Sequence, residues 1–177
     1  MYFHRFTLLL LGVLLSGSAL ALSTDRSQPL QIVANKATID NVKGIAIYEG
    51  NVVVTQGSIR IDANVITINY TQKQDIEKVV ADGKPAHFKQ RLDSGDDIKA
   101  KAMQMEYNAI KSMLYLRKDA ELHKQRNDKD LSSSSAPHIK YDTKRGIIKA
   151  GKGNTKDGRT TVTIYPQPSV KKSSSKK

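Results

Sequence analysis

The chain has 177 residues, with 29 Lys and Arg against 17 Asp and Glu, and a formal net charge of +12 at pH 7. It contains no cysteine, which excludes a disulfide-stabilised scaffold and any metal or redox site built on thiolates. The length suffices for one domain with a substantial hydrophobic core. A basic charge is typical of proteins that bind nucleic acid or another anionic surface, so the compartment decides between these partners.

The first 21 residues, MYFHRFTLLLLGVLLSGSALA, have the organisation of a secretory signal peptide. A short basic start precedes an apolar run from Leu8 to Leu15, and Ala19-Leu20-Ala21 forms a small-residue cleavage site. The rival interpretation, a membrane anchor, requires about 20 apolar residues, and this run is shorter. We therefore expect cleavage after Ala21 and export, to the periplasm if the source is a Gram-negative bacterium. Export argues against nucleic acid as a partner and leaves anionic lipids or cell-surface glycolipids.

The segment 22–165 is expected to form one all-β domain. No stretch keeps the apolar spacing of an amphipathic helix, whereas apolar and polar residues alternate in short runs between turns, about every eight to twelve residues. Such a pattern indicates a sandwich or an opened barrel. The predicted elements are strands at Val52–Val54, Ile76–Ala81, Ala86–Gln90, Met113–Leu116, Ala120–Leu122, Ile147–Ile148 and Thr160–Tyr165, with turns at 56–57, 82–85 and 94–96.

Two regions depart from the strand pattern. The segment NDKDLSSSSAP (127–137) has low complexity and is predicted to be a long hairpin loop or a frayed strand. The end of the chain, PQPSVKKSSSKK (166–177), has four lysines and no acidic residue and is predicted to be a disordered basic tail. Part of the positive charge is therefore assigned to a solubilising tail and not to the folded domain.

The segment IRIDANVITINY (59–70) begins as a regular strand and then changes parity. Apolar side chains occupy Ile59 and Ile61, and they resume at Ile66 and Ile68 on the opposite parity. An unbroken strand would direct these two sets to opposite faces. A β-bulge inserts one extra residue, bends the strand and re-aims the side chains beyond it. We therefore predict a bulge after Ala63 that turns all four isoleucines toward one interior.

The same change of parity recurs in three other segments, after Ala34, Ala100 and Ala136. In each of them, as after Ala63, apolar or aromatic residues stand three and five positions beyond the alanine. Chance is the alternative explanation, because β-rich chains reuse few residue types. As an internal repeat, the four copies predict stacked, bent strands that line a continuous apolar trough.

The sequence contains no catalytic or metal-binding constellation. His87 and His123 lie in alternating strands and are interpreted as surface residues, and the acidic pair Asp96-Asp97 is interpreted as a solvated turn. The zinc-protease, nucleophile-elbow and phosphate-loop motifs are absent. We expect no cofactor, no metal and no catalytic residue, and hence a binding or structural protein and not an enzyme.

Three stretches, QPLQI (28–32), YEGNVVVTQG (48–57) and GKPAHFKQ (83–90), resemble in order and spacing the LptA-type (OstA-like) periplasmic proteins that carry lipopolysaccharide. The likeness extends from Gln28 to Pro166. It implies a twisted, incomplete antiparallel β-jelly roll that is open at both ends. It also implies an apolar groove that holds the acyl chains of lipopolysaccharide.

The resemblance implies partners as well. The N-terminal edge would pair with a homologous domain anchored in the inner membrane, and the C-terminal edge with a domain of the outer-membrane translocon. Copies of the chain would join head to tail into a bridge, and an ATP-driven inner-membrane complex would supply the directional work. The expected location is the periplasm.

The lipid-binding groove is predicted from the repeats and the resemblance together. On the family pattern Leu30 and Ile32 lie near the entry, and Phe88 and Tyr107 match aromatic positions that face the groove. The full predicted set is Leu30, Ile32, Ile39, Val52, Val54, Ile59, Ile61, Ile66, Ile68, Phe88, Met103, Met105, Tyr107, Leu116, Ile139 and Tyr141. Lys and Arg residues near the rim are candidates to meet lipid phosphates, but the sequence does not identify them.

One region departs from the family pattern. The last repeat usually opens with an aromatic residue and a glycine, and here Ser132 to Ser135 and Ala136 stand in that place. Ile139, Tyr141 and Asp142 are kept. We therefore expect the wall near the C-terminal end to be polar or locally open.

The competing interpretation is an exported β-sheet protein that binds anionic glycans, or assembles structurally, through its basic outer face. Such binding would not require acyl chains and would weaken strongly with salt. An exported hydrolase would need a cleft with convergent polar groups, for which the sequence offers no candidates.

Overall fold

The computed structural model describes residues 24–153 and 158–166. The predicted signal peptide (1–21) and basic tail (166–177) lie outside the described residues, except for Pro166. The described elements are α1 (Thr24–Ser27), β1 (Leu30–Val33), β2 (Lys36–Asp40), β3 (Ile45–Gln56), β4 (Ile59–Tyr70), β5 (Ile76–Arg91), β6 (Asp97–Asn108), β7 (Met113–Arg126), β8 (Lys129–Asp142), β9 (Ile147–Gly151) and β10 (Thr161–Ile164).

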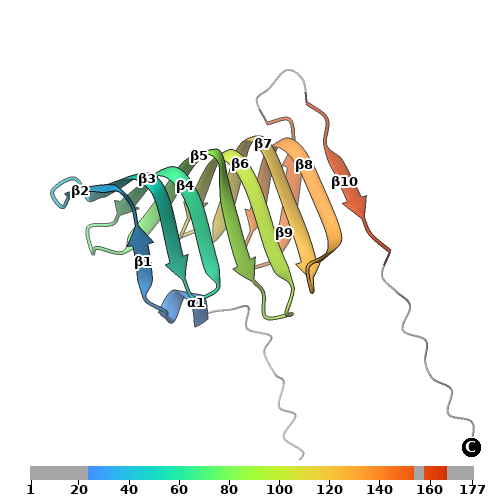
Figure 1. Cartoon of the computed structure of the whole chain (residues 1–177), viewed down its shortest axis with the longest axis horizontal. Coiled ribbons are helices and arrows are strands. Elements are labelled where there is room, and N and C mark those ends of the chain that lie inside the picture. The colour runs from blue at the N-terminus through green and yellow to red at the C-terminus, as the bar shows by residue number, and fades with distance from the viewer. Residues whose placement is uncertain (1–23, 154–157, 167–177) are drawn as a thin grey trace, which may run out of the picture.

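All ten strands belong to one antiparallel sheet, which confirms the all-β expectation. The strand order is β1-β3-β4-β5-β6-β7-β8-β10, while β2 also pairs with β3 and β9 also pairs with β8. The sheet stays open because β1 and β2 form its edge at one end and β9 and β10 form its edge at the other (Figure 1). Within residues 24–153 and 158–166, no helix is long and apolar enough to cross a membrane.

The long strands β3 to β8 bend near their middles, where they fold over along the upper edge of the view in Figure 1. The bend divides the sheet into the β1 arm, bounded by β1 and β10, and the β2 arm, bounded by β2 and β9. The register between neighbouring strands shifts at this level, between Glu49/Val52, Asp62/Val65, Asp82/Ala86, Lys101/Gln104 and Arg117/Ala120.

The change of parity predicted in β4 is confirmed, but the extra residue of the bulge lies in the partner strand β3, at Gly50 and Asn51, and not in β4. Ala63 pairs with Val52 and Val65 pairs with Glu49, so that Asn64 faces two residues of β3. Ile61 before the bulge and Ile66 after it are consequently both buried. The copy in β8 behaves in the same way, since Ala136, Ile139 and Tyr141 are all buried. Both halves of these strands therefore face one interior.

The other two copies of the repeat differ from the prediction. In β6 the shift comes after Ala102, which is buried, so Met103 is 37% exposed and Met105 is buried. The alanine at the bend of β6 is Ala102 and not Ala100, because Ala102 pairs with Ala86 beside the register shift, and the buried Met105 stands three residues beyond it. In the first copy, the change of parity separates two short strands, β1 and β2, and bends neither.

The serine-rich segment forms a strand, and the prediction of a long loop there was wrong. Asn127 and Asp128 alone make the turn between β7 and β8, and both have positive φ angles, as a two-residue hairpin requires. Ser132 to Ser135 pair with β7 on one side and with β10 on the other. The neighbouring strands β7 and β10 thus supply backbone hydrogen-bond partners for this segment, although its serine side chains do not themselves indicate a strand.

Gly83 lies at the bend of β5, where a Cβ atom would meet the backbone of Pro85 and Ala86. We expect Gly83→Ala to lower the free energy of unfolding by about 2 kcal/mol or more, because backbone atoms must move to admit the methyl group. Urea denaturation measures the effect. Gly151→Ala is the matched control, since a Cβ there meets nothing within 4 Å. Equal unfolding midpoints for the two variants would contradict the tight bend.

Candidate functional site

The inner face of the β1 arm carries a row of directly paired residues that crosses the whole sheet. Cross-strand partners in an antiparallel ladder project to the same face, so the row can be followed from pair to pair. It is apolar except at the serine of β8. Its members are Ile32, Val54, Ile61, Phe88, Ala100, Leu122, Ser134 and Val162.

A second row crosses the β2 arm, and every member is aliphatic or aromatic. It consists of Ile39, Ala46, Ile68, Val79, Tyr107, Leu114, Tyr141 and Ile148. Each row begins on an edge strand at the N-terminal end and finishes on an edge strand at the C-terminal end. The inner faces therefore form an apolar surface that runs through the molecule from one open end to the other.

The structure places most of the predicted groove residues on these inner faces. Ten are buried in a single hydrophobic cluster: Val52, Val54, Ile61, Ile66, Ile68, Phe88, Met105, Leu116, Ile139 and Tyr141. Four are partly buried and pack against that cluster: Leu30, Ile32, Ile59 and Tyr107. Met103 lies outside it. Ile39 pairs with the buried Ala46 but is 60% exposed, because β2 is an edge strand with a neighbour on one side only.

The prediction missed several inner residues, among them Ile98, Leu114 and Leu122, all of which are buried. The alternation of the strand could have identified Leu114, because it stands two positions before Leu116 on β7 and therefore projects to the same face. Alanines at the bend, such as Ala86 and Ala120, are fully buried as well. Their small side chains let the two arms approach where the strands turn.

Tyr141 is the largest fully buried side chain. Its hydroxyl group has no hydrogen-bond partner among the described residues. Burial, with a smaller contribution from the charge of Asp142, raises the pKa of Tyr141 to about 12, so that the phenol stays neutral. A buried hydroxyl without a partner costs roughly 1–3 kcal/mol, and a polar atom of a bound molecule in the interior would remove that cost.

Asp96 and Asp97, predicted to be solvated, are both buried at the tip of the β1 arm. Asp96 accepts from Arg126 Nε at 2.6 Å and from Ser94 Oγ at 3.0 Å, and lies 3.0 Å from Lys124 Nζ. Burial opposes ionisation of Asp96, but the hydrogen bonds from Arg126, Lys124 and Ser94 outweigh it and lower its pKa to about 2. Hydrogen bonding from Arg91 lowers the pKa of Asp97 in the same direction.

A third buried acid, Asp25, lies at the same tip, beside the turn between β3 and β4. Asp25 of α1 accepts hydrogen bonds from the Ser58 backbone N–H at 2.7 Å and from Ser58 Oγ at 2.8 Å. Gln90 Nε2 lies 3.4 Å from the same carboxylate. Polar groups thus border the apolar inner face where the hairpins of the β1 arm end.

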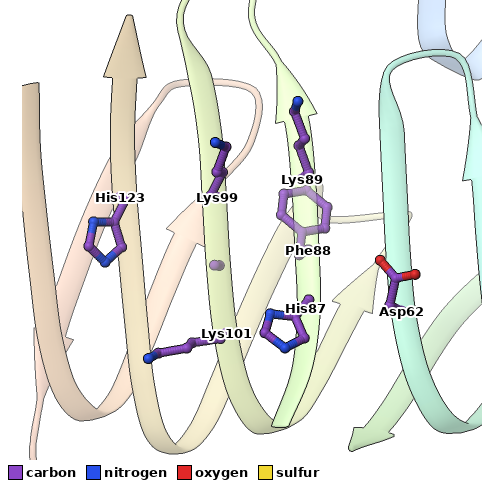
Figure 2. A pocket seen from close by; sticks show the side chains of 8 residues that line it. Asp62, His87, Phe88, Lys89, Lys99, Lys101 and His123 are labelled. Atoms are coloured by element: carbon purple, nitrogen blue, oxygen red, sulfur yellow. The ribbon is translucent and has the colours of Figure 1, made fainter. Parts of the chain in front are cut away.

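The outer face of the β1 arm carries a hollow of about 210 Å³ (Figure 2). Its lining residues come from four neighbouring strands and are Asp62, His87, Phe88, Lys89, Lys99, Ala100, Lys101 and His123. Most of its cations already have acidic partners: Lys99 lies 3.2 Å from Asp128, and Lys101 lies 3.0 Å from Glu121. Within the described residues, no group of three or more His, Cys, Asp or Glu could hold a metal ion.

This open, folded sheet with an apolar interior defines a jelly-roll class of β-protein. Comparison with known proteins identifies the family within that class. The family model for the LptA/(LptD N-terminal domain) LPS transport protein matches residues 31–147. The lipopolysaccharide export system protein LptH of Pseudomonas aeruginosa is 35% identical over 160 residues, covering 88% of this chain and 89% of LptH. LptA of Haemophilus influenzae is 39% identical over 158 residues, covering 88% of each chain.

A solved structure agrees with these relatives. The crystal structure of LptH, the LptA homologous periplasmic component of the lipopolysaccharide transport device of P. aeruginosa, matches with a TM-score of 0.69 and 30% identity. The match covers 81% of this chain and 99% of that chain. The chain therefore belongs to the LptA/LptD N-terminal domain family of lipopolysaccharide transport proteins, as the sequence resemblance indicated.

The Asp96 cluster makes stability depend on pH. The folded-state pKa of about 2 lies below the ordinary value of 3.8, so the carboxylate stabilises the fold above pH 3.8 and loses this effect as the pH falls towards 2. The difference corresponds to about 2 kcal/mol. Asp96→Asn is expected to lose that amount at neutral pH and to flatten the acid limb of the stability curve. Thermal unfolding between pH 7 and 2 measures both effects. Asp128→Asn, at an 85% exposed side chain, should change neither.

Proposed function

We propose that the protein is a periplasmic carrier that binds the acyl chains of lipopolysaccharide along its inner face and passes the lipid from an inner-membrane export complex to an outer-membrane translocon. The observation that carries this proposal is the pair of inner rows, which run from edge strand to edge strand and contain one polar residue, Ser134. The predicted signal peptide and the names of the relatives as lipopolysaccharide export proteins support the location and the cargo.

Free energy explains why such a carrier needs an apolar path and no active site. Burying one CH₂ group is worth about 0.8 kcal/mol, so a chain of about 12 carbons gains roughly 10 kcal/mol on leaving water. Free diffusion of the lipid is therefore blocked, whereas movement between two similar apolar surfaces is nearly level in free energy. The role proposed is transport and not catalysis.

The inner residues are covered by one another in the structure, with Leu116 and Ile139 fully buried. Acyl chains must therefore replace contacts among these side chains, which requires some separation of the two arms. A chain that slides in along a row exchanges one set of apolar contacts for another. The open ends admit it without breaking the long-strand ladders β3 to β8.

The edge strands supply the proposed docking surfaces. Seven of the nine exposed large hydrophobic residues in the described chain lie at the two ends of the sheet: Val33, Ile39 and Val42 at one, and Ile147, Val162, Ile164 and Tyr165 at the other. Unpaired edges recruit further strands, and apolar side chains beside them favour docking. We assign the N-terminal end to a homologous inner-membrane domain, the C-terminal end to the translocon, and both to head-to-tail contact between copies.

The alternative function, binding of anionic glycans at the outer face, has the hollow of Figure 2 in its favour. The ion pairs of Lys99 and Lys101 reduce the charge that such a site would offer. The two functions differ in what they require of the ligand. Binding at the inner face requires acyl chains, whereas binding at the outer face requires only the saccharide.

Photo-crosslinking amino acids at Ile32, Phe88 and Tyr107 are expected to capture lipopolysaccharide, because all three lie on the inner rows. One at Lys78, which pairs with Asn69 and Asn108 on the opposite face, should not capture it. Deacylated lipopolysaccharide should compete weakly. Equal labelling at all four sites, or equal competition by the deacylated form, would refute binding at the inner face.

A charge at an end strand is expected to weaken head-to-tail assembly. Ile164 is 78% exposed on β10, so Ile164→Lys should leave the fold intact while placing an unpaired charge in the docking surface. The expected loss of self-association is roughly tenfold or more. Ile110→Lys is the matched control, since Ile110 is 70% exposed but lies in the turn between β6 and β7, away from both ends. Sedimentation velocity over a concentration series compares the two variants.

A further inference from the structure

The tip of the β1 arm carries two similar ion clusters on opposite faces of the sheet. On the inner side, Asp96 is bound by Lys124 and Arg126. On the outer side, Asp97 is bound by Arg91 at 3.0 Å and lies 4.0 Å from Lys89. The faces follow from the register, because Lys124 pairs with the buried Ile98, whereas Asp97 stands one residue before Ile98.

The inner cluster continues the apolar row. Lys124 comes two residues after Leu122 on β7 and therefore projects from the same face, about 7 Å further along the strand. Its partners across the sheet are Ile98 on one side and Ser132 on the other. An apolar surface that ends in paired cations matches an amphiphile whose hydrocarbon chains end in an anionic group.

The cluster holds more positive charge than it neutralises. A single carboxylate faces two cations, which leaves a formal charge of +1. The side chain of Asp96 is 1% exposed, whereas those of Lys124 and Arg126 are 38% and 55% exposed. The acid thus lies beneath the cations and fixes them in place. Arg126 meets Asp96 through Nε, one of the five N–H donors of a guanidinium group.

We propose that Lys124 and Arg126 bind a phosphate group of the lipid while the acyl chains lie along the inner row of the β1 arm. Asp96 acts as a positioning residue, which holds both cations and does not touch the phosphate. Guanidinium and ammonium groups suit phosphate oxygens, and fixing them before binding lowers the entropic penalty of ordering long side chains. This inference rests on the proposed function, because it names the group that recognises the lipid's anionic part.

The outer cluster provides a matched control within the same chain. Lys89 and Arg91 also bring two cations to one buried carboxylate, but from the face that carries no apolar row. Replacing either pair by glutamine removes the same formal charge from the same end of the sheet. A general electrostatic attraction would respond to both replacements, whereas a phosphate site at the inner rim responds to one.

The test measures binding of phosphorylated lipid A and of the same lipid after phosphatase treatment, with inorganic phosphate as a competitor. The wild-type protein is expected to bind the phosphorylated form roughly tenfold more tightly, a factor that corresponds to about 1.4 kcal/mol. Lys124→Gln/Arg126→Gln should abolish this preference, and Lys89→Gln/Arg91→Gln should keep it. Excess inorganic phosphate should weaken binding of the phosphorylated form only.

Loss of the inner cations leaves the buried Asp96 carboxylate without a cation, so the triple variant Asp96→Asn/Lys124→Gln/Arg126→Gln provides a form without that charge. It should also lack the preference, and its thermal unfolding shows whether it is folded. Equal affinity of the wild-type protein for both lipids, or equal loss of preference in the inner and outer variants, would overturn the phosphate site. Failure of the proposed function gives another result, in which neither acylated lipid binds more tightly than a deacylated saccharide.

Discussion

A shift of register near the middle of the long strands is the constraint on which the rest of the structure depends. A regular strand would send Ile61 and Ile66 to opposite faces, so that one of the two would be exposed. With Asn64 facing two residues of β3, both isoleucines point inward. Because neighbouring strands shift register at the same level, the sheet folds over as a whole and gains one interior.

A sheet folded along a line across its strands covers its inner face. Each of its end strands, however, has a partner on one side only. The two inner rows therefore reach the edges, and the apolar residues on those edges stay exposed, as at Ile39 and Val162. The two proposed roles, carrying a lipid and joining a neighbour, would both follow from this one geometry. The proposed transport requires an interior that continues into a neighbouring molecule, and the open edge strands have backbone groups available for that contact.

Ion pairs lie at the tip of the β1 arm, beside the apolar interior. Buried carboxylates at the tip of the β1 arm hold lysine and arginine side chains at the boundary of the inner face and on the face behind it. Lys99 and Lys101 of the outer hollow are paired with more exposed acids, Asp128 and Glu121. The inner face of the arm is thus apolar except at Ser134, and Lys124 and Arg126 lie paired with Asp96 at its end.

Apart from the serine-rich part of β8, the sequence by itself indicated most of the strands, their faces and the bend of β4, because alternation and its change of parity are local properties of the chain. It also carried the family motifs and most of the groove residues. The tertiary structure decided which faces are covered. Ile39 and Met103 follow the same local pattern as Ile68 and Met105, yet they are exposed, because Ile39 lies on an edge strand and Met103 lies at the register shift of β6. It alone brought Asp96 to Arg126, 30 residues away, because strand register joins residues that no local pattern relates.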